Sequence, residues 1–359
     1  MKRSITFLLP CRNPTPVGGF KIIYEYANRL ANDGFDVNLV YSATLLWSER
    51  NLFQKIKGIV AYPTFFIFKT GYLPNSWFKL NKHINIFWVP SPNEKFIPDA
   101  EFIYATACGT ANYVNNYSAK KGKKLYLIQH MEDWDFEYER LIETYKYPLK
   151  KIVISQWLKN LIKSIGEPSI LIHNGLDFEA FRVTTSQDQR NPRSVLMLYH
   201  EAKWKGTDIG LKVFEKLFQI DKKFTLTMFG AFPKPQDLPS YVKYYQSPSQ
   251  KDLVKLYNKS AVFLGTSFSE GWGLTVAEAM QCGCAVVCTD VNGYNEMAIN
   301  HQTALLSKSG DYESLYENVI KIIENKSLRL RLSEESNKFI KQFQWEKSYK
   351  KLKNLLLED

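Results

Sequence analysis

Short apolar strands that alternate with helical patterns are the feature that most constrains the fold of this chain. Residues 4–9 form an apolar run typical of a buried strand, residues 20–32 place apolar side chains at helical spacing, and residues 36–41 form the next strand pattern. This strand–helix–strand start predicts a parallel sheet. The alternation begins again at residue 194, after a polar stretch at residues 183–193 that we interpret as a linker.

The chain length supports two domains of this kind. Its 359 residues suffice for two packed cores, and 45% hydrophobic with 23% charged residues is a globular composition. We therefore expect an α/β protein with a parallel sheet in each half and a ligand bound in the cleft between the halves.

The charge balance limits the classes of partner. A formal net charge of +11 favours an anionic partner, such as a nucleotide, a nucleic acid or a membrane surface. We find no nucleic-acid recognition motif in the sequence and expect no nucleic-acid partner. The sequence has no apolar run as long as a membrane span, and the run near its start is too short for a signal peptide, so we expect a cytoplasmic protein.

Five cysteines raise the question of a metal site or a disulfide. Cys282, Cys284 and Cys288 are clustered, but Cys288 falls in an apolar strand pattern and no histidine lies near it in the sequence. An odd count without a C-x-x-C pair argues against a disulfide framework. We therefore predict small buried hydrophobic side chains and no metal site.

Residues 45–83 differ in character from the rest of the chain. Six lysines and arginines stand there against a single acidic residue, and aromatic residues are interleaved with them. Such a segment is compatible with peripheral contact to an anionic membrane, or with a cover over an acceptor pocket. The alternative is a helix and a core strand at residues 62–68 with a solvated basic face.

The stretch at residues 267–293 combines two carboxylates with a glycine-rich turn. Glu270 and Glu278 are separated by seven residues, and a Gly-Trp-Gly turn at 271–273 precedes a helix-forming run. The turn and the helix N-terminus suit a phosphate, and two acceptors beside a phosphate suit a sugar nucleotide. The alternative is an ordinary helix–strand unit with a favourable glutamate in its first turn.

Two further candidates lie in the first half. Gly18 and Gly19 precede the first helical pattern and permit close approach of a ligand to the backbone, although they equally suit a plain turn. His130 follows a strand pattern at residues 125–129, at the end where open α/β sheets bind ligands. A structural role is equally compatible with this position.

These motifs together resemble the retaining glycosyltransferases of family 4. The segment from Glu270 to Gly283 resembles the E-x7-E signature of that family, and Lys205 before Gly206 resembles its phosphate-binding Lys-Gly. His-Asn-Gly-Leu-Asp at residues 173–177 is similar to the element that precedes its second domain.

The resemblance implies the GT-B fold, in which two Rossmann-like domains face each other across a cleft. Residues 1–180 would form the N-terminal, acceptor-side domain and residues 181–340 the nucleotide-sugar-binding domain. A C-terminal helix at residues 341–359 would cross back to the first domain.

The resemblance also implies a role for each candidate residue. Glu270 would contact the hydroxyls of the donor sugar, Glu278 would hold the ribose, and Lys205 would neutralise the diphosphate, whose charge grows as the sugar bond breaks. His130 would contact the donor sugar near the reacting carbon. Further contacts to the phosphates, sugar or base would come from Gly18, Gly19, Gly230, Gln246, Gly273, Leu274 and Thr275.

One position departs from the family pattern. The family has an arginine shortly before the Lys-Gly, and that arginine shares the diphosphate; His200 occupies roughly its position here. Either Lys203 supplies the second positive charge or His200 binds as a hydrogen-bond donor. Because histidine titrates near neutral pH and arginine stays charged, the pH dependence of donor binding is open.

The function implied is a retaining, metal-independent hexosyltransferase without a cofactor. It would move a sugar from a nucleotide-diphosphate donor to a growing, lipid-linked bacterial surface polysaccharide at the inner face of the cell membrane. Tyr199-His200 and the patterns at residues 105–111 and 128–132 resemble bacterial rhamnosyltransferases. The alternatives are a nucleotide-sugar epimerase or a phosphorylase of the same fold, and a non-catalytic glycan-binding partner subunit.

Overall fold

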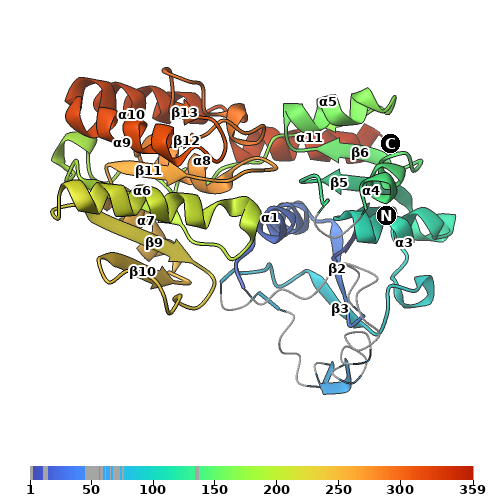
Figure 1. Cartoon of the computed structure of the whole chain (residues 1–359). Helices are drawn as coiled ribbons and strands as arrows, with labels where there is room; N and C mark the ends of the chain where they lie inside the picture. Colours follow the sequence, from blue (N-terminus) through green and yellow to red (C-terminus); the bar gives the residue numbers. More distant parts are fainter. Residues whose placement is uncertain are drawn as a thin grey trace. The chain divides into compact units, whose positions relative to one another are not determined.

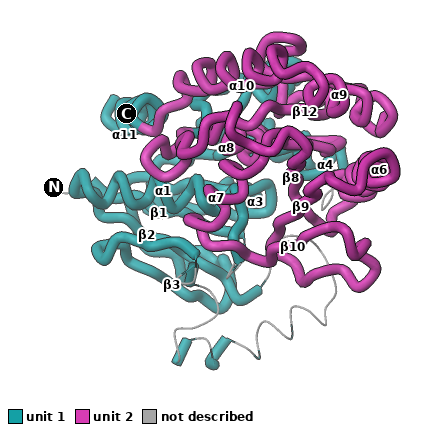
Figure 2. The backbone as a smooth tube through the Cα atoms, turned by 90° about the vertical axis from the view of Figure 1, so that its left-hand side faces the viewer, with its two compact units in different colours: residues 1–174, 346–359 teal, residues 175–345 magenta. Residues whose placement is uncertain are grey.

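A computed structural model describes residues 3–10, 15–44, 56, 60, 62–64, 66–67, 73–74, 77–133 and 137–358. The chain divides into two compact units (Figure 1). Unit 1 comprises residues 1–174 and 346–359, and unit 2 comprises residues 175–345, as coloured in Figure 2. The predicted boundaries after residues 180 and 340 lie a few residues from these limits.

Unit 1 contains a seven-stranded sheet in the order β3-β2-β1-β4-β5-β6-β7, and each neighbouring pair is parallel. Its strands are β1 (Ser4–Leu8), β2 (Asp36–Ser42), β3 (Asn85–Val89), β4 (Phe102–Ala105), β5 (Lys123–Ile128), β6 (Lys150–Val153) and β7 (Ile170–Leu171). Its helices are α1 (Gly18–Asn32), α3 (Cys108–Asn116), α4 (Tyr138–Tyr145), α5 (Gln156–Ser164) and α11 (Trp345–Glu358).

Unit 2 contains a six-stranded parallel sheet in the order β10-β9-β8-β11-β12-β13. Its strands are β8 (Ser194–Leu198), β9 (Thr225–Gly230), β10 (Val242–Gln246), β11 (Val262–Gly265), β12 (Ala285–Thr289) and β13 (Leu305–Ser307). Its helices are α6 (Thr207–Ile220), α7 (Gln250–Lys259), α8 (Leu274–Gln281), α9 (Tyr312–Glu324) and α10 (Lys326–Ile340).

Both sheets follow the strand order of a Rossmann fold. The order reverses between β1 and β4 in unit 1, and between β8 and β11 in unit 2. Such a reversal is a topological switch point, and the carboxyl ends of the two strands beside it are the usual ligand-binding position. The predicted class, α/β with two Rossmann-like parallel sheets, is confirmed.

The core of unit 2 explains why its central strands read as continuous apolar runs. All four residues of β11 and all five of β12 are buried, as expected for parallel strands with helices on both faces. Helix α6 adds Val213, Phe214 and Leu217, apolar residues at helical spacing that belong to the same buried cluster.

Helix α11 belongs to unit 1, in agreement with a C-terminal helix that returns to the first domain. On α11, Tyr349 Oη and Lys353 Nζ each donate to Asp33 Oδ2 at 2.6 Å. These two hydrogen bonds, from Lys353 and then Tyr349, lower the pKa of Asp33. The C-terminal helix expected at residues 341–359 begins later, at Trp345, after α10 ends at Ile340.

The polar stretch at residues 183–193 is not a linker, and that prediction is wrong. These residues lie within unit 2, and only 5% of Arg190 is exposed. Its guanidinium donates to the backbone carbonyls of Tyr257, Ser260 and Cys282, at or near the C-terminal ends of α7 and α8. A cation there complements the helix dipoles and fixes the segment to the unit.

Two other regions differ from the expectation. Helix α4, at Tyr138–Tyr145, lies where no helix was predicted. Residues 62–64 and 66–67 are helical, whereas the alternative reading placed a strand at residues 62–68. Most of the basic segment at residues 45–83 lies outside the described residues, so its membrane contact stays a prediction. No helix in the described part of the chain has both the length and the apolar character to cross a membrane.

The clustered cysteines are buried, as predicted. Cys288 lies in β12, and burial raises the pKa of the Cys284 thiol to about 11. Among the residues that the structure describes, no group of three His, Cys, Asp or Glu side chains could hold a metal ion.

Candidate functional site

Lys205 and Glu270 meet at the switch point of unit 2. Lys205 ends a short 3-10 turn, η4 (Lys203–Lys205), in the loop after β8. Glu270 lies in the loop after β11, the strand beside β8. Lys205 Nζ lies 2.7 Å from Glu270 Oε1, and their side chains are 20% and 10% exposed. The pair is therefore a partly buried, charge-assisted hydrogen bond at the position where this fold binds ligands.

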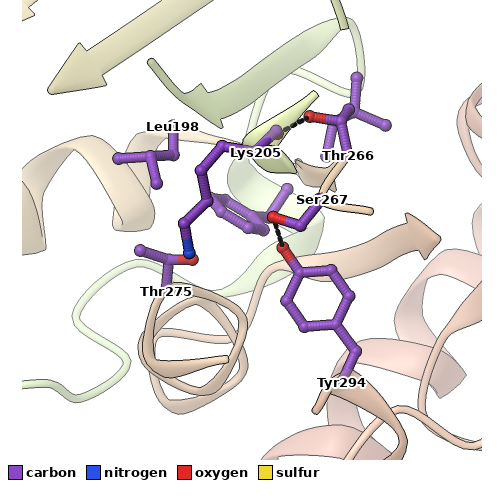
Figure 3. A pocket seen from close by; sticks show the side chains of 9 residues that line it. Leu198, Lys205, Thr266, Ser267, Thr275 and Tyr294 are labelled. Atoms are coloured by element: carbon purple, nitrogen blue, oxygen red, sulfur yellow. Dashed lines mark hydrogen bonds between the residues drawn. The ribbon is translucent and has the colours of Figure 1, made fainter. Parts of the chain in front are cut away.

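A second chain of hydrogen bonds reaches the same carboxylate oxygen. Ser267 Oγ donates to Glu270 Oε1 at 2.7 Å, and Tyr294 Oη donates to Ser267 Oγ at 3.0 Å. Figure 3 shows the Tyr294 hydroxyl directed at Ser267. The backbone of this loop is also fixed, because Thr266 Oγ1 donates to the carbonyl of Lys205 at 3.0 Å.

A small pocket lies against these residues (Figure 3). It is walled by the ends of β8 and β11, the first turn of α8 and the ring of Tyr294, and it contains the Lys205 side chain. Its lining residues are Leu198, Lys205, Phe263, Leu264, Gly265, Thr266, Ser267, Thr275 and Tyr294.

Glu278 is held separately, on α8. It is 7% exposed, and Tyr257 Oη donates to its Oε2 at 3.3 Å. Burial, and then the charge of Glu278, raise the pKa of Tyr257 well above its ordinary value. Tyr257 therefore stays a neutral hydroxyl donor. Both glutamates of the spaced pair are thus buried, and each has a buried tyrosine in its hydrogen-bond network.

Gly273 sets the start of α8. Its φ of 96° is left-handed, and a Cβ at this position would lie 2.6 Å from Cδ1 of Tyr294. Only glycine meets both conditions without strain. Leu274 and Thr275 then form the first turn of α8, whose leading N–H groups have no partner within a helix. The expected turn followed by a helix N-terminus is present.

His200 is a neutral side chain in this setting. The Ala202 N–H donates to His200 Nδ1 at 3.0 Å, so the ring proton belongs on Nε2. Burial, and then the charge of Lys205, lower the pKa of His200 to about 4. The ring packs edge-on against Phe232, with centroids 4.8 Å apart. His200 is therefore not a second cation at neutral pH, and its available polar group is an Nε2–H donor.

The remaining candidates of unit 2 lie at neighbouring strand ends. Lys203 is exposed in the same 3-10 turn as Lys205. Gly230 ends β9 and is buried, and Gln246 ends β10 and is exposed. Because β8, β9 and β10 are adjacent, these residues share the carboxyl edge of the sheet with Lys205.

The candidates of unit 1 lie together within that unit. Gly18 and Gly19 are the first residues of α1, and Gln129 Nε2 donates to the carbonyl of Gly19 at 3.3 Å. His130 follows Gln129 directly, and its Nδ1 lies 2.8 Å from the Met131 carbonyl oxygen. The residue after β5, Gln129, thus contacts the glycine pair, and His130 is its neighbour in the sequence.

The helix N-terminus at the switch point of unit 1 is already occupied by a carboxylate. Helix α3 begins at Cys108 just after β4, and the N–H of Cys108 donates to Glu132 Oε2 at 2.9 Å. Glu132 is 6% exposed. A carboxylate there satisfies the helix dipole as an anionic ligand would. An added phosphate is therefore better accommodated at the switch point of unit 2.

Three contributors were not singled out from the sequence: Ser267, Tyr257 and Tyr294. Ser267 comes two residues after the end of β11, so the strand-end rule that selected His130 could have selected it. The two tyrosines carry no such signal, because the chain has 21 tyrosines and these two lie among core aromatics.

Comparison with known proteins agrees with this geometry. Residues 185–339 match the family model of "Glycosyl transferases group 1", and this match lies within unit 2. An uncharacterized glycosyltransferase of Methanocaldococcus jannaschii is 27% identical over 205 residues, 55% of this chain and 56% of that protein. The capsular polysaccharide biosynthesis glycosyltransferase CapM of Staphylococcus aureus is 25% identical over 217 residues, with 55% and 56% covered. These parts of the chain are therefore similar to group 1 glycosyltransferases.

The fold extends the likeness over the whole chain. The crystal structure of Anabaena HepE in complex with UDP-glucose matches with a TM-score of 0.74 and 16% identity, covering 99% of this chain and 100% of that one. This likeness shows the GT-B fold. In sequence, the chain spans little more than half the length of the curated relatives it matches.

Proposed function

We propose that this chain is a retaining glycosyltransferase that uses a nucleotide-diphosphate sugar. The observation that carries the proposal is the Lys205–Glu270 pair at the unit 2 switch point, beside the first turn of α8. A cation and helix N–H groups at one position suit a diphosphate, and the paired carboxylate suits sugar hydroxyls. The family match to the same unit supports this reading.

In this proposal, each residue of the site contacts a different part of the donor. Lys205 and the leading N–H groups of α8 stabilise the charge that develops on the nucleoside diphosphate as the sugar bond breaks. The uncharged Nε2–H of His200 adds a hydrogen bond, and Lys203 is the exposed cation in the same turn. Glu270 binds hydroxyls of the donor sugar, and Glu278 holds the ribose.

The other assigned residues complete the proposal. Gly230 and Gln246 border the base, and Thr275 borders the pocket. In unit 1, Gly18, Gly19 and His130 act on the donor sugar. No metal or cofactor takes part in this scheme, and the anionic leaving group is neutralised by protein groups alone.

For the acceptor, we propose a growing, lipid-linked surface polysaccharide. This proposal draws on CapM, whose name assigns it to capsular polysaccharide biosynthesis. A net charge of +11 is compatible with work at an anionic membrane surface. A rhamnosyl donor is the finer proposal that follows from the Tyr199-His200 pattern.

A donor screen tests the proposal. The protein is incubated with UDP-glucose, GDP-mannose and dTDP-rhamnose, and thermal shift identifies the donor that binds, because a ligand of the native state raises its stability. Proton NMR then follows the anomeric configuration of the transferred or hydrolysed sugar. Binding of one donor with retained configuration supports the proposal. Inverted configuration contradicts retention, and an epimerised sugar favours the epimerase.

A further inference from the structure

Tyr294 connects the carboxylate of Glu270 to the core of unit 2. It lies in a short 3-10 turn, η5 (Tyr294–Glu296), after β12, and it is 2% exposed. Its hydroxyl donates to Ser267 Oγ at 3.0 Å, and Ser267 Oγ donates to Glu270 Oε1 at 2.7 Å. The carbonyl of Ser267 is also fixed, because Thr289 Oγ1 donates to it at 2.6 Å. Ser267 is therefore fixed through both its hydroxyl and its carbonyl, which link Tyr294 to Glu270.

The ring of Tyr294 has a tightly defined position. A Cβ at Gly273 would lie 2.6 Å from its Cδ1, and a Cβ at Gly265 would lie 3.2 Å from its hydroxyl oxygen. The ring is thus in contact with both the start of α8 and the end of β11. A hydroxyl held this firmly gives its hydrogen-bond acceptor a defined position as well.

We propose that Tyr294 is a positioning residue that acts through Ser267: it holds Oε1 of Glu270 against Lys205 and so orients the carboxylate for the donor sugar. This inference rests on the proposed function, in which Glu270 contacts that sugar. Reactions of this kind depend on placement to within about 1 Å, so loss of one supporting hydroxyl lowers turnover.

The electrostatic setting keeps the hydroxyl protonated. Burial, and then the charge of Glu270, raise the pKa of Tyr294 well above its ordinary value. Tyr294 therefore remains a hydrogen-bond donor over the whole pH range of ordinary assays. The carboxylate oxygen receives two donors at 2.7 Å, one from Lys205 and one from Ser267. Only the Ser267 donor depends on Tyr294.

The two hydrogen bonds from Tyr294 to Ser267 and from Ser267 to Glu270, here called the relay, can be tested with a double variant. Tyr294→Phe and Ser267→Ala are each expected to lower kcat for nucleoside diphosphate release from the identified donor by about tenfold. The double variant should lose no more than Ser267→Ala alone, because Tyr294 acts only through Ser267. Affinity for UDP, which contains the ribose but lacks the transferred donor sugar, should stay within about twofold of wild type in all three.

Tyr257→Phe is the matched comparison. It removes one buried tyrosine hydroxyl beside the other carboxylate, Glu278. Because Glu278 is assigned to the ribose, this variant should weaken UDP binding by about fivefold and change kcat less than Tyr294→Phe does. Equal kcat and KM profiles for the two tyrosine variants would mean a general packing effect and overturn the positioning role.

The relay can also be measured without turnover. The coupling between Tyr294→Phe and Glu270→Gln in the unfolding constant should be about fivefold, and it should vanish when Ser267 is alanine. If this coupling is found but the wild-type protein turns over no donor, the positioning of Glu270 through Ser267 is supported and the proposed function is contradicted. Strictly additive effects in the unfolding constant, or unchanged kcat in Tyr294→Phe, would overturn the relay itself.

Discussion

Lys205 and Glu270 are 65 positions apart in the sequence, yet Nζ and Oε1 lie 2.7 Å from each other. They meet because the loops that carry them follow β8 and β11, which are neighbours in the sheet of unit 2. The arrangement leaves neither charge isolated in a partly buried place, where an uncompensated ion costs several kcal/mol. In the proposed function, a bound diphosphate shares the cation with the carboxylate.

Lys205→Ala should weaken UDP binding by about two orders of magnitude, measured by titration calorimetry. The variant removes the cation and leaves the Glu270 carboxylate near the anionic ligand, which together cost about 2–5 kcal/mol. Lys251→Ala, an exposed lysine at the start of α7, is the control and should stay within about twofold. Equal affinities in the two variants would show that the diphosphate binds elsewhere.

Gly273→Ala should destabilise unit 2 more than Gly310→Ala does. Both glycines have positive φ, 96° and 84°, so both variants carry the left-handed penalty of about 1–2 kcal/mol. The Cβ at Gly273 also lies 2.6 Å from Tyr294, whereas the nearest atom at Gly310 is 3.3 Å away, on Phe268. Urea unfolding should show an extra loss of about 1–3 kcal/mol for Gly273→Ala. A difference below measurement error would mean that the Tyr294 ring moves without cost.

The lowered pKa of His200 predicts that the folded protein loses stability at acid pH. Its pKa is about 4 in the folded protein, below the ordinary histidine value near 6.5, so the unfolded chain binds the proton more tightly. Stability attributed to His200 is therefore complete above about pH 6.5 and falls as the pH drops toward 4. Allowing for its partial exposure, the loss is of order 2 kcal/mol.

The comparison for this prediction is His200→Gln, which keeps a hydrogen-bond donor and does not titrate. Unfolding curves between pH 7 and 4 should show a smaller loss in the variant than in the wild type. Parallel curves would contradict a buried, neutral His200.

Arg190→Met should destabilise unit 2 by about 3 kcal/mol. The change removes a buried cation and leaves the carbonyls of Ser260 and Cys282 without its N–H donors. Arg193→Met is the matched control from the same segment, because Arg193 is 46% exposed in its pair with Asp221. It should cost at most about 1 kcal/mol. If both variants lose a similar free energy of unfolding in urea, Arg190 does not fix this segment, and residues 183–193 behave as a linker.

The Arg190 segment also shows where sequence reasoning fails. A polar run without periodicity is typical of a linker, and nothing in its composition indicates a guanidinium that donates to carbonyls at the ends of two helices. Those carbonyls belong to residues about 70 and 90 positions away. By contrast, the strands predicted at residues 4–9 and 36–41 match β1 and β2 to within one residue, because apolar runs and flanking turns are local signals.

The candidate site could likewise be predicted only in part from the sequence. Lys205, Glu270 and Glu278 were found from motifs whose spacing is local, and the parallel order of β8 and β11 brings the first two together. Ser267 and Tyr294 act through side-chain directions that depend on the packed sheet. The charge state of His200 likewise depends on burial beside Lys205, which composition does not reveal.

We propose above that the Lys205–Glu270 site catalyses sugar transfer. The most direct measurement is the initial rate of nucleoside diphosphate release from the identified donor by wild type and Glu270→Gln, with urea unfolding in parallel. We expect Glu270→Gln to lower the rate by about 10²–10³ while the fold is retained. A Glu270→Gln rate equal to that of the wild type would contradict it.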